Sequence, residues 1–361
     1  MAKNSLFRNI VLLPLSKIYG MATAVRNKLY DWGVFKQVEF EVPVITVGNL
    51  AVGGTGKTPH TEYIVRFLRN HYNVAILSRG YKRSTKGFVL ATPHSTPRDI
   101  GDEPYQMYNK FGHKVIVAVC ERRVIGIQKL LELHPEINLI VLDDGLQHRH
   151  VKPKVSVMLT EYSRPYFKDS MLPYGRLRES AKNVSRADIV IVTKCPNTAK
   201  AIDYRILKKN LDLIPAQDLF FSRYSYNMPR PVFPAEATKV RAPELDSLNK
   251  QDSLFVICGI SNPRPFIRYV KNFLPAVKFR IFADHHQYTR SDLEDILHRF
   301  KTMGGERRYI LTTEKDAVRL INNPYFPPEL KPYIFFVPIR VKFNEIDNLT
   351  FEDSLIKFIN A

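Results

Sequence analysis

Residues 46–65 read TVGNLAVGGTGKTPHTEYIV. The hydrophobic run before the glycines predicts a buried strand, and residues 58–69 have the pattern of a helix. A glycine-rich turn between a strand and a helix, ending in Lys57 and Thr58, is the context of a phosphate-binding P-loop. Its glycines let backbone N–H groups face phosphate oxygens at the positive end of the helix. We therefore expect this loop to hold the phosphates of a nucleotide.

The last residues of the loop have separate roles. In a P-loop, the lysine (Lys57) reaches the β- and γ-phosphates, and the hydroxyl of the next residue (Thr58) is a ligand for Mg²⁺. The loop sequence departs from the usual P-loop motif at one position, because Ala51 stands where the first glycine is expected. The predicted nucleotide-binding residues are Ala51, Val52, Gly53, Gly54, Thr55, Gly56, Lys57 and Thr58.

Short β-rich runs and helical segments alternate along most of the chain after residue 40. Continuous runs of Val, Ile and Leu are typical of parallel strands that are covered by helices on both faces. The predicted strands of this first series are 42–49, 73–80, 114–119, 137–145, 154–161 and 187–194. We therefore predict an α/β fold with a P-loop NTPase-type parallel sheet as its core.

A proline-rich stretch separates this series from a second one. Residues 217–246 contain four prolines and little helical periodicity, which is typical of an interdomain connection. A second βα series starts near residue 253, and the strand-like run 333–343 and the helix near 351–359 fit either lobe. The predicted parts are an N-terminal amphipathic, membrane-associating helix at 1–35, a P-loop core at 36–220, and a smaller C-terminal α/β lobe at 221–361 that closes over the cleft.

The segment LIVLDDGLQH (139–148) ends a hydrophobic run in two aspartates. Open α/β sheets bind ligands at the carboxyl ends of their strands, and a strand that ends in acids is the expected Mg²⁺-side partner of a P-loop. Asp143 and Asp144 are therefore candidate metal ligands, with a simple turn or cap as the alternative. Gln147 and His148 follow closely enough to face the same site.

The segment DIGDEPYQM (99–107) sets Asp102 and Glu103 just before a helical pattern. Carboxylates in this position often cap a helix and interact favourably with its dipole. The alternative is a catalytic carboxylate that takes a proton from an acceptor hydroxyl. The residue pattern alone favours the cap.

The segment FADHHQYTR (282–290) ends a strand of the second lobe with Asp284, His285 and His286. A metal site is one interpretation, but adjacent histidines on an extended segment point to opposite sides and seldom bind one ion together. A more useful role is an imidazole that crosses the cleft and tunes a carboxylate of the first lobe.

The segment LPYGRLRES (172–180) places Arg176, Arg178 and Glu179 in a loop that contains Gly and Pro. Arginines in such a loop suit a phosphate or an anionic substrate. A solvated loop is the alternative interpretation.

The chain of 361 residues carries 54 Lys and Arg against 35 Asp and Glu, a formal charge of +19. This charge predicts a polyanionic partner: nucleic acid, an acidic membrane surface or a phosphorylated substrate. No recognisable nucleic-acid motif is present, so we expect no nucleic-acid partner. The three cysteines are widely separated, which argues against a disulfide framework or a cysteine-built metal site and fits a reducing cytosol.

Residues 1–30 contain five basic residues, no acidic residue, and apolar residues at helical spacing. Their longest apolar run, IVLLPL (10–15), is far shorter than the roughly 20 residues of a membrane-spanning helix. The pattern predicts either a basic amphipathic helix that lies on an anionic membrane or a helix packed on its own domain.

Taken together and in order, these segments resemble one family, the tetraacyldisaccharide 4'-kinases of Gram-negative envelopes. The first P-loop glycine is also replaced in that family, so Ala51 is part of the resemblance. The matching segments span roughly residues 43–318 and read VGNLAVGGTGKTP, LSRGY, GDEP, DDGLQH, LPYGRLRE, FADHH and TTEKDAV.

The resemblance implies a lipid kinase that uses ATP and Mg²⁺. Its reaction would move the γ-phosphate to the 4'-hydroxyl of a tetraacyldisaccharide 1-phosphate and form lipid IVA in lipid A biosynthesis. Asp102 would be the catalytic base and His285 its partner across the cleft, although the doubled histidine leaves His286 as an alternative. The implied metal-side residues are Thr58, Asp143 and Asp144, and the implied supporting residues are Glu103, Gln147, His148, Arg178 and Glu179.

The resemblance also implies partners and a location: an acylated glucosamine disaccharide 1-phosphate as substrate, an anionic membrane surface, and the cytoplasmic face of the inner membrane, bound peripherally. It implies no obligate protein partner. The main alternative is a membrane-associated P-loop ATPase or GTPase of the partitioning or targeting type. Those proteins often carry a signature lysine just before the paired glycines, where this chain has Val52, and they need neither GDEP nor FADHH.

Overall fold

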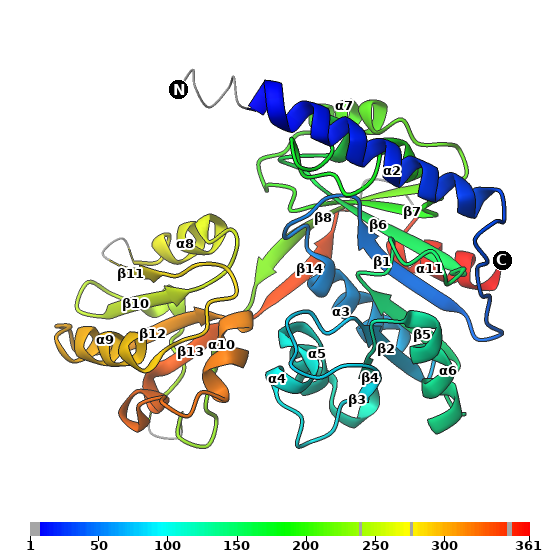
Figure 1. Ribbon diagram of the computed structural model, residues 1–361. Helices are drawn as coiled ribbons and strands as arrows, with labels where there is room; N and C mark the ends of the chain where they lie inside the picture. The colour runs from blue at the N-terminus through cyan, green and yellow to red at the C-terminus, as the bar shows by residue number, and fades with distance from the viewer. Residues whose placement is uncertain (1–7, 238–239, 275–276, 345–348) are drawn as a thin grey trace.

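The computed structural model describes residues 8–237, 240–274, 277–344 and 349–361. Residues 1–7 of the predicted N-terminal segment therefore lie outside the described residues. Two sheets organise the chain into a large lobe and a smaller one (Figure 1). Two strands of the large sheet, β8 (Asp218–Tyr226) and β14 (Ile339–Phe343), extend toward the smaller lobe and connect the two.

The large sheet contains nine strands in the order β14-β8-β7-β6-β1-β5-β2-β4-β3. Its pairings from β8 through β4 are all parallel, and only the two edge strands, β14 and β3, pair antiparallel. All six strands predicted for the first series are confirmed. Besides β8 and β14, the sheet consists of β1 (Val44–Asn49), β2 (Val74–Ser78), β3 (Val89–Leu90), β4 (Ile116–Val119), β5 (Leu139–Asp143), β6 (Val155–Glu161) and β7 (Ile189–Thr193).

Helices cover both faces of the large sheet and bury its aliphatic side chains. One face packs against α3 (Lys57–Leu68), α5 (Asp102–Phe111) and α11 (Phe351–Asn360). The other face packs against α6 (Arg123–Leu133) and α7 (Ala201–Leu211). Because β1 and β5 are parallel neighbours, the P-loop and the aspartates after β5 emerge at the same edge of the sheet.

The smaller lobe is built on a five-stranded sheet in the order β11-β10-β12-β13-β9, parallel except for β9. Helices α9 (Arg290–Lys301) and α10 (Glu314–Ile321) cover one face, and α8 (Arg264–Lys271) covers the other. Its strands are β9 (Arg230–Pro231), β10 (Ser253–Cys258), β11 (Lys278–Ile281), β12 (Arg308–Thr313) and β13 (Ile334–Val337). The second βα series of the sequence thus forms its own core.

The predicted division at residues 220/221 differs from the structure in two places. The boundary cuts through β8, which belongs entirely to the large sheet. Residues 339–361 also return to the large lobe, because β14 pairs with β8 and α11 packs into the large core. Pairing with β8 satisfies the backbone of β14, and burial of Phe351 removes a large apolar surface from water.

The lobes also touch beside the connecting strands. Val318 of α10 is buried in a small cluster with Ile100 and Tyr105 of the large lobe. Ile100 ends α4 (Pro97–Ile100), directly before the GDEP segment. This contact brings the start of α5 against α10.

Helix α2 (Leu13–Asp31) runs along the outside of the large lobe (Figure 1). Its polar side faces the protein: Ser16 is buried and donates a hydrogen bond to the carbonyl of Met171 at 2.8 Å. Its apolar side faces outward, with exposed fractions of 58% for Ile18 and 63% for Met21. Among the described residues, no helix combines the length and apolar character needed to cross a bilayer.

Candidate active site

The P-loop connects β1 to α3 and has the backbone that phosphate binding requires. Gly53 and Gly56 have φ values of 113° and 98°, a region that side-chain-bearing residues rarely adopt. A Cβ atom on Gly56 would lie 2.3 Å from the hydroxyl oxygen of Tyr224 in β8. Asn49 Nδ2 donates to Thr55 Oγ1 at 2.6 Å, which ties the loop to the end of β1.

The structure explains why the first position of the loop does not need glycine. Ala51 pairs as an antiparallel bridge with Leu177, and the N–H of Val52 donates to the carbonyl of Arg176 at 2.8 Å. The start of the loop is therefore extended backbone that lies against the LPYGRLRE segment. The Ala51 side chain packs against the buried cluster that contains Leu177.

His60 supports the loop from α3 and was not identified in the sequence. Its Nδ1 lies 2.7 Å from the carbonyl oxygen of Gly56, and its Nε2 lies 2.8 Å from Ser222 Oγ. Burial lowers the pKa of His60 to about 4, so the ring is neutral at pH 7. Since a carbonyl can only accept, Nδ1 carries the proton and Nε2 accepts from the Ser222 hydroxyl.

Asp143, the last residue of β5, and Asp144, directly after it, lie beside the P-loop lysine, as their spacing predicts. Lys57 Nζ lies 3.5 Å from Asp144 Oδ1, and Arg178 Nη1 lies 3.3 Å from Asp144 Oδ2. Thr61 Oγ1 donates to Asp143 Oδ1 at 2.9 Å. The oxygen donors of Asp143, Asp144 and Thr58 are the kind that Mg²⁺ prefers. In the part of the chain that is described, no group of three or more His, Cys, Asp or Glu side chains is arranged to hold a metal.

The two carboxylates have opposite electrostatic environments. Burial and the neighbouring charge of Asp144 raise the pKa of Asp143 to about 6. Burial also acts to raise the pKa of Asp144, but Lys57 and Arg178 hold that pKa below its usual value. Lys57 is the cation that acts on both carboxylates. Binding of a further cation beside them would therefore be electrostatically favourable.

This difference predicts opposite stability effects for two isosteric substitutions without metal or nucleotide. The folded-state pKa of Asp143 exceeds its ordinary value of 3.8. The protonated Asp143 side chain therefore contributes to the stability of the fold at low pH, and this contribution is lost as pH rises through about 6. Asp143→Asn should raise the free energy of unfolding at pH 7 by on the order of 1–3 kcal/mol. Asp144 has a lowered pKa, so Asp144→Asn should reduce stability at pH 7.

Urea unfolding at pH 4 and pH 7 measures both effects. The stabilisation by Asp143→Asn should shrink toward pH 4, because the wild-type carboxyl is then largely protonated in the folded state. Equal destabilisation by both substitutions at pH 7 would contradict these environments.

The second half of the site lies where α5 meets the smaller lobe. Asp102 is the first residue of α5, and its side chain contacts His285 and Arg319 of the smaller lobe. His285 Nδ1 lies 3.5 Å from Asp102 Oδ2, and Arg319 Nε donates to the same oxygen at 2.8 Å. Burial acts to raise the pKa of Asp102, but His285 and Arg319 lower it, so Asp102 is ionised at neutral pH.

The structure separates the two adjacent histidines. His285 has a φ of 59° and directs its ring to Asp102. His286 stacks on Phe282 with ring centroids 4.5 Å apart, and its Nε2 lies 2.9 Å from Asp292 Oδ2. The geometry therefore places His285, and not His286, against the carboxylate of the first lobe.

Arg319 and Lys315 lie in this region but were not among the predicted site residues. The Arg319 side chain is 1% exposed and also donates to the carbonyl of Gly259 at 3.0 Å and to Asp316 Oδ1 at 3.1 Å. Lys315 Nζ donates to Glu103 Oε1 at 2.7 Å. A signal was available, because Asp316 and Arg319 are three residues apart, the spacing that places two side chains on one face of a helix, and α10 does contain both.

Of the remaining predicted residues, Arg178 and Gln147 lie at the P-loop, whereas Glu179 has no described contact with it. Arg178 bridges Asp144 and Gln147, whose Nε2 donates to the carbonyl of Asn49 at 2.6 Å, so both lie at the P-loop. Burial, followed by the charge of Arg123, lowers the pKa of His148 to about 4. Glu179 is buried, accepts from Asn183 at 2.9 Å and pairs with Arg186. Its described contacts are thus structural, in contrast to its predicted supporting role at the site.

The two halves are electrostatically connected. The charge of Glu103 contributes to the raised pKa of Asp143, after burial and Asp144. A Cβ atom on Gly54 would lie 3.0 Å from Ser261 Oγ, so the P-loop also approaches the smaller lobe. One region between the lobes thus holds the predicted P-loop, the two candidate metal-binding carboxylates and a carboxylate–imidazole pair.

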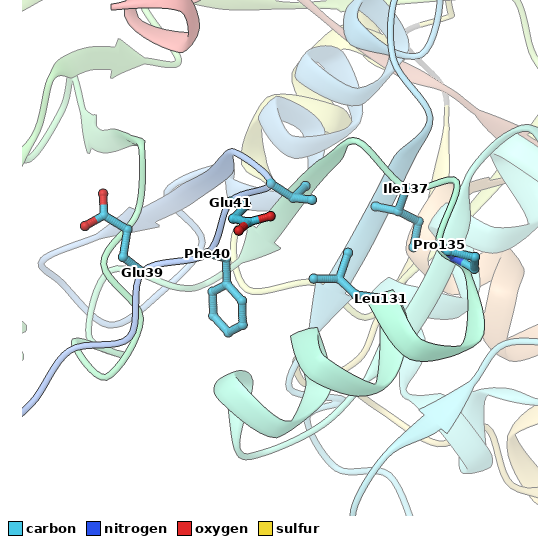
Figure 2. Close-up of a pocket in the computed structure, with 7 residues that line it drawn as sticks. Glu39, Phe40, Glu41, Leu131, Pro135 and Ile137 are labelled. Atoms are coloured by element: carbon cyan, nitrogen blue, oxygen red, sulfur yellow. The ribbon is translucent and has the colours of Figure 1, made fainter.

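A cavity of about 450 Å³ lies elsewhere, between the 39–42 segment and the end of α6 (Figure 2). It adjoins the chain just before β1 and β5, at the edge of the sheet opposite the P-loop. Its charged lining residues are Glu39 and Glu41, which would repel a nucleotide. This cavity is therefore separate from the candidate active site.

Comparisons with known proteins agree with this geometry. The chain matches the tetraacyldisaccharide-1-P 4'-kinase family over residues 8–360. The tetraacyldisaccharide 4'-kinase of Bacteroides thetaiotaomicron is 47% identical over 353 residues, which cover 96% of this chain and 92% of that protein. That of Bacteroides fragilis strain YCH46 is 46% identical over 360 residues, covering 99% and 95%.

A solved structure supports the same relationship and the predicted fold class. The crystal structure of "apo" form LpxK from Aquifex aeolicus in complex with ATP has a TM-score of 0.72 and 28% sequence identity to this chain. The similarity covers 99% of this chain and 100% of that one. The chain therefore belongs to the tetraacyldisaccharide-1-P 4'-kinase family, as its ordered motifs predict.

Proposed function

We propose that this protein transfers the γ-phosphate of ATP to the 4'-hydroxyl of a tetraacylated glucosamine disaccharide 1-phosphate, forming lipid IVA in lipid A biosynthesis. Membership of the family supports the reaction. The observation that carries the mechanism is the pairing of Asp102 with His285 in the same region as Asp143 and Asp144. A partitioning or targeting ATPase is not favoured, since it needs no carboxylate–imidazole pair between two lobes.

The residues of the site divide the work of phosphoryl transfer. The P-loop N–H groups and Lys57 hold the phosphates, and Thr58, Asp143 and Asp144 would hold Mg²⁺, which neutralises charge on the transferring group when bound. Asp102 accepts the proton of the sugar hydroxyl. A carboxylate of low pKa is sufficient for this step, because phosphoryl transfer depends mainly on positioning and electrostatic stabilisation. His285 and Arg319 hold the Asp102 carboxylate in place.

A lipid phosphorylation assay tests the reaction. Purified protein with Mg·ATP and the disaccharide 1-phosphate should give a bis-phosphorylated lipid, and ATP consumption should depend on the lipid. A parallel reaction without lipid is the control. Rapid ATP hydrolysis that is the same with and without lipid, with no phosphorylated lipid formed, would refute the proposal.

We further propose that α2 binds the anionic cytoplasmic face of the inner membrane peripherally. Its exposed face carries Ile18, Met21 and Val25, with the cations Lys17 and Lys28 also exposed. Apolar side chains flanked by cations suit the boundary between headgroups and acyl chains of an anionic membrane. The inner side of α2 is held to active-site loops, since Tyr19 and Arg26 donate to the carbonyls of Arg178 and Gln147. A membrane-bound α2 would thus bring the P-loop edge to the lipid substrate.

Charge substitutions on the outer face of α2 test membrane binding. The triple variant Ile18→Glu, Met21→Glu, Val25→Glu should lose most flotation with anionic liposomes, because it places carboxylates at an anionic apolar surface. The matched control is Ile202→Glu, Ile206→Glu on α7, where both isoleucines are more than half exposed. Flotation equal to that of the control would remove the anchoring role from α2.

A further inference from the structure

A second cavity, of about 110 Å³, lies where the connecting strands meet both lobes. Its charged lining residues are Arg66, Arg69, Lys110, Arg230, Glu314 and Arg340. Five of these side chains are basic and one is acidic. We refer to Arg66, Arg69, Arg230 and Arg340 as the hinge arginines.

The hinge arginines come from both lobes. Arg66 and Arg69 lie at the end of α3, and Arg340 lies in β14, which pairs with β8 in the large sheet. Arg230 lies in β9 of the smaller sheet. A ligand held by all four would therefore join the two lobes beside their connection.

The positive charge in this cavity is only partly balanced by the protein, because the charges of Glu62 and Glu314 act on Arg66 but, among the described residues, are the only carboxylates found to do so. Lys110 pairs with Glu62 at 2.5 Å and with Glu314 at 2.8 Å, so the nearby carboxylates are already used. Within the described residues, none of the hinge arginines forms an ion pair or a side-chain hydrogen bond. Burial, followed by the charge of Arg340, lowers the pKa of Arg66, as expected for like charges held close together.

The cavity is distinct from the nucleotide site. Arg66 and Arg69 lie nine and twelve residues beyond Lys57 on α3, which corresponds to about 14 and 18 Å along the helix. Phosphates bound by the P-loop cannot reach the hinge arginines from there. The adenine of ATP carries no negative charge and would not balance four guanidinium groups.

The hinge arginines line one small cavity, with Arg66 and Arg69 half-buried and Arg230 and Arg340 exposed, and such a set of guanidinium groups is suited to one class of ligand. Their planar forks donate paired hydrogen bonds to phosphate oxygens, and several of them together neutralise more than one negative charge. We propose that the hinge arginines bind a compact phosphate-bearing anion that links the two lobes. Because the anion would bind the joined lobes better than separated ones, it stabilises this arrangement of the lobes by linkage.

Binding of pyrophosphate in Mg²⁺-free buffer, measured by calorimetry, tests the proposal directly. The wild-type protein should bind pyrophosphate at two sites, the P-loop and the hinge arginines. Lys57→Met should weaken pyrophosphate binding only at the P-loop. Arg66→Gln, Arg340→Gln should weaken only the second, on the order of tenfold or more, because two charge-assisted contacts are lost. The control Arg205→Gln, Arg268→Gln removes the same charge from two exposed arginines on α7 and α8 and should retain both sites.

Thermal unfolding separates a binding role from a structural one. Without anion, Arg66→Gln, Arg340→Gln should keep or raise the Tm, because it relieves like-charge repulsion. Pyrophosphate should raise the Tm of Lys57→Met but not of the protein that carries all three substitutions. A lower Tm without anion, or pyrophosphate binding to Arg66→Gln, Arg340→Gln that equals the control, would overturn the proposal.

Competition identifies the source of the phosphate. Displacement of pyrophosphate from Lys57→Met by vesicles with phosphatidic acid, and not by phosphatidylcholine vesicles, indicates a lipid headgroup at the hinge arginines. Displacement by soluble inorganic phosphate alone indicates a free anion. Because binding is measured without lipid phosphorylation, failure of this proposal is distinguishable from failure of the kinase assignment.

Discussion

Replacing Asp102 by Asn should lower the kcat of lipid phosphorylation by about 10²- to 10⁴-fold, the range that a positioned general base supplies. Asparagine keeps the shape of the side chain but cannot accept the hydroxyl proton. His285→Ala should also reduce kcat strongly, because His285 lies 3.5 Å from the Asp102 carboxylate and helps to hold it. ATP binding, measured separately, should change little in both variants, since the P-loop is intact.

His286→Ala is the matched control for His285→Ala. The two histidines are adjacent, but His286 contacts Asp292 and Phe282 instead of the carboxylate of the first lobe. We expect His286→Ala to affect stability more than kcat. Turnover that survives Asp102→Asn and His285→Ala, or that is lost equally in His286→Ala, would contradict the assigned roles.

Gly56→Ala should reduce ATP binding and turnover by about 10²-fold, the cost of displacing a reacting group by roughly 1 Å. Gly56 has a φ of 98°, and an added Cβ atom would lie 2.3 Å from the Tyr224 hydroxyl oxygen and 3.3 Å from His60 Nδ1. Alanine is strained at this φ, so the loop would shift immediately before Lys57 together with the Tyr224 side chain, and the lysine would move away from the phosphates. Nucleotide-binding calorimetry and the lipid assay measure the two losses.

Gly87→Ala controls for the general cost of a side chain at positive φ. Gly87 has a φ of 74°, but nothing lies within 4 Å of its added Cβ atom. Both substitutions should lower the free energy of unfolding by roughly 1 kcal/mol through backbone strain. Only Gly56→Ala should lose nucleotide binding. Normal ATP affinity in Gly56→Ala would show that the loop can adjust around the extra methyl group.

The predicted nucleotide half of the site was accessible from the sequence because its parts are local. The Val/Ile/Leu runs predicted the six parallel strands, and the glycines before Lys57 predicted a loop at the end of β1. Asp143 ends β5, which neighbours β1, so the rule that parallel strands place their carboxyl ends together was sufficient to bring it near Lys57. The ordered motifs then indicated the family, which the comparisons confirm.

The return of β14 and α11 to the large lobe could not be predicted in this way. A strand-like run near the end of the chain has the same local pattern in either sheet, and only the pairing with β8 distinguishes them. The amphipathic pattern of α2 likewise left open which side faces the protein. The structure shows the polar side inward, with Ser16 and Asn27 buried and Met21 exposed.

The sequence by itself determined the α/β class, the glycine-rich loop between β1 and α3, the acids at its side and the family, because each depends on spacing within one strand, loop or helix. Only the tertiary structure decided that His285 rather than His286 faces Asp102, that Arg319 binds the same carboxylate, and that Glu179 pairs with Arg186. The two contacts of Asp102 join residues of different lobes, 183 positions apart for His285 and 217 for Arg319. Their geometry is set by how two separately formed cores pack against each other, and no local pattern records that packing.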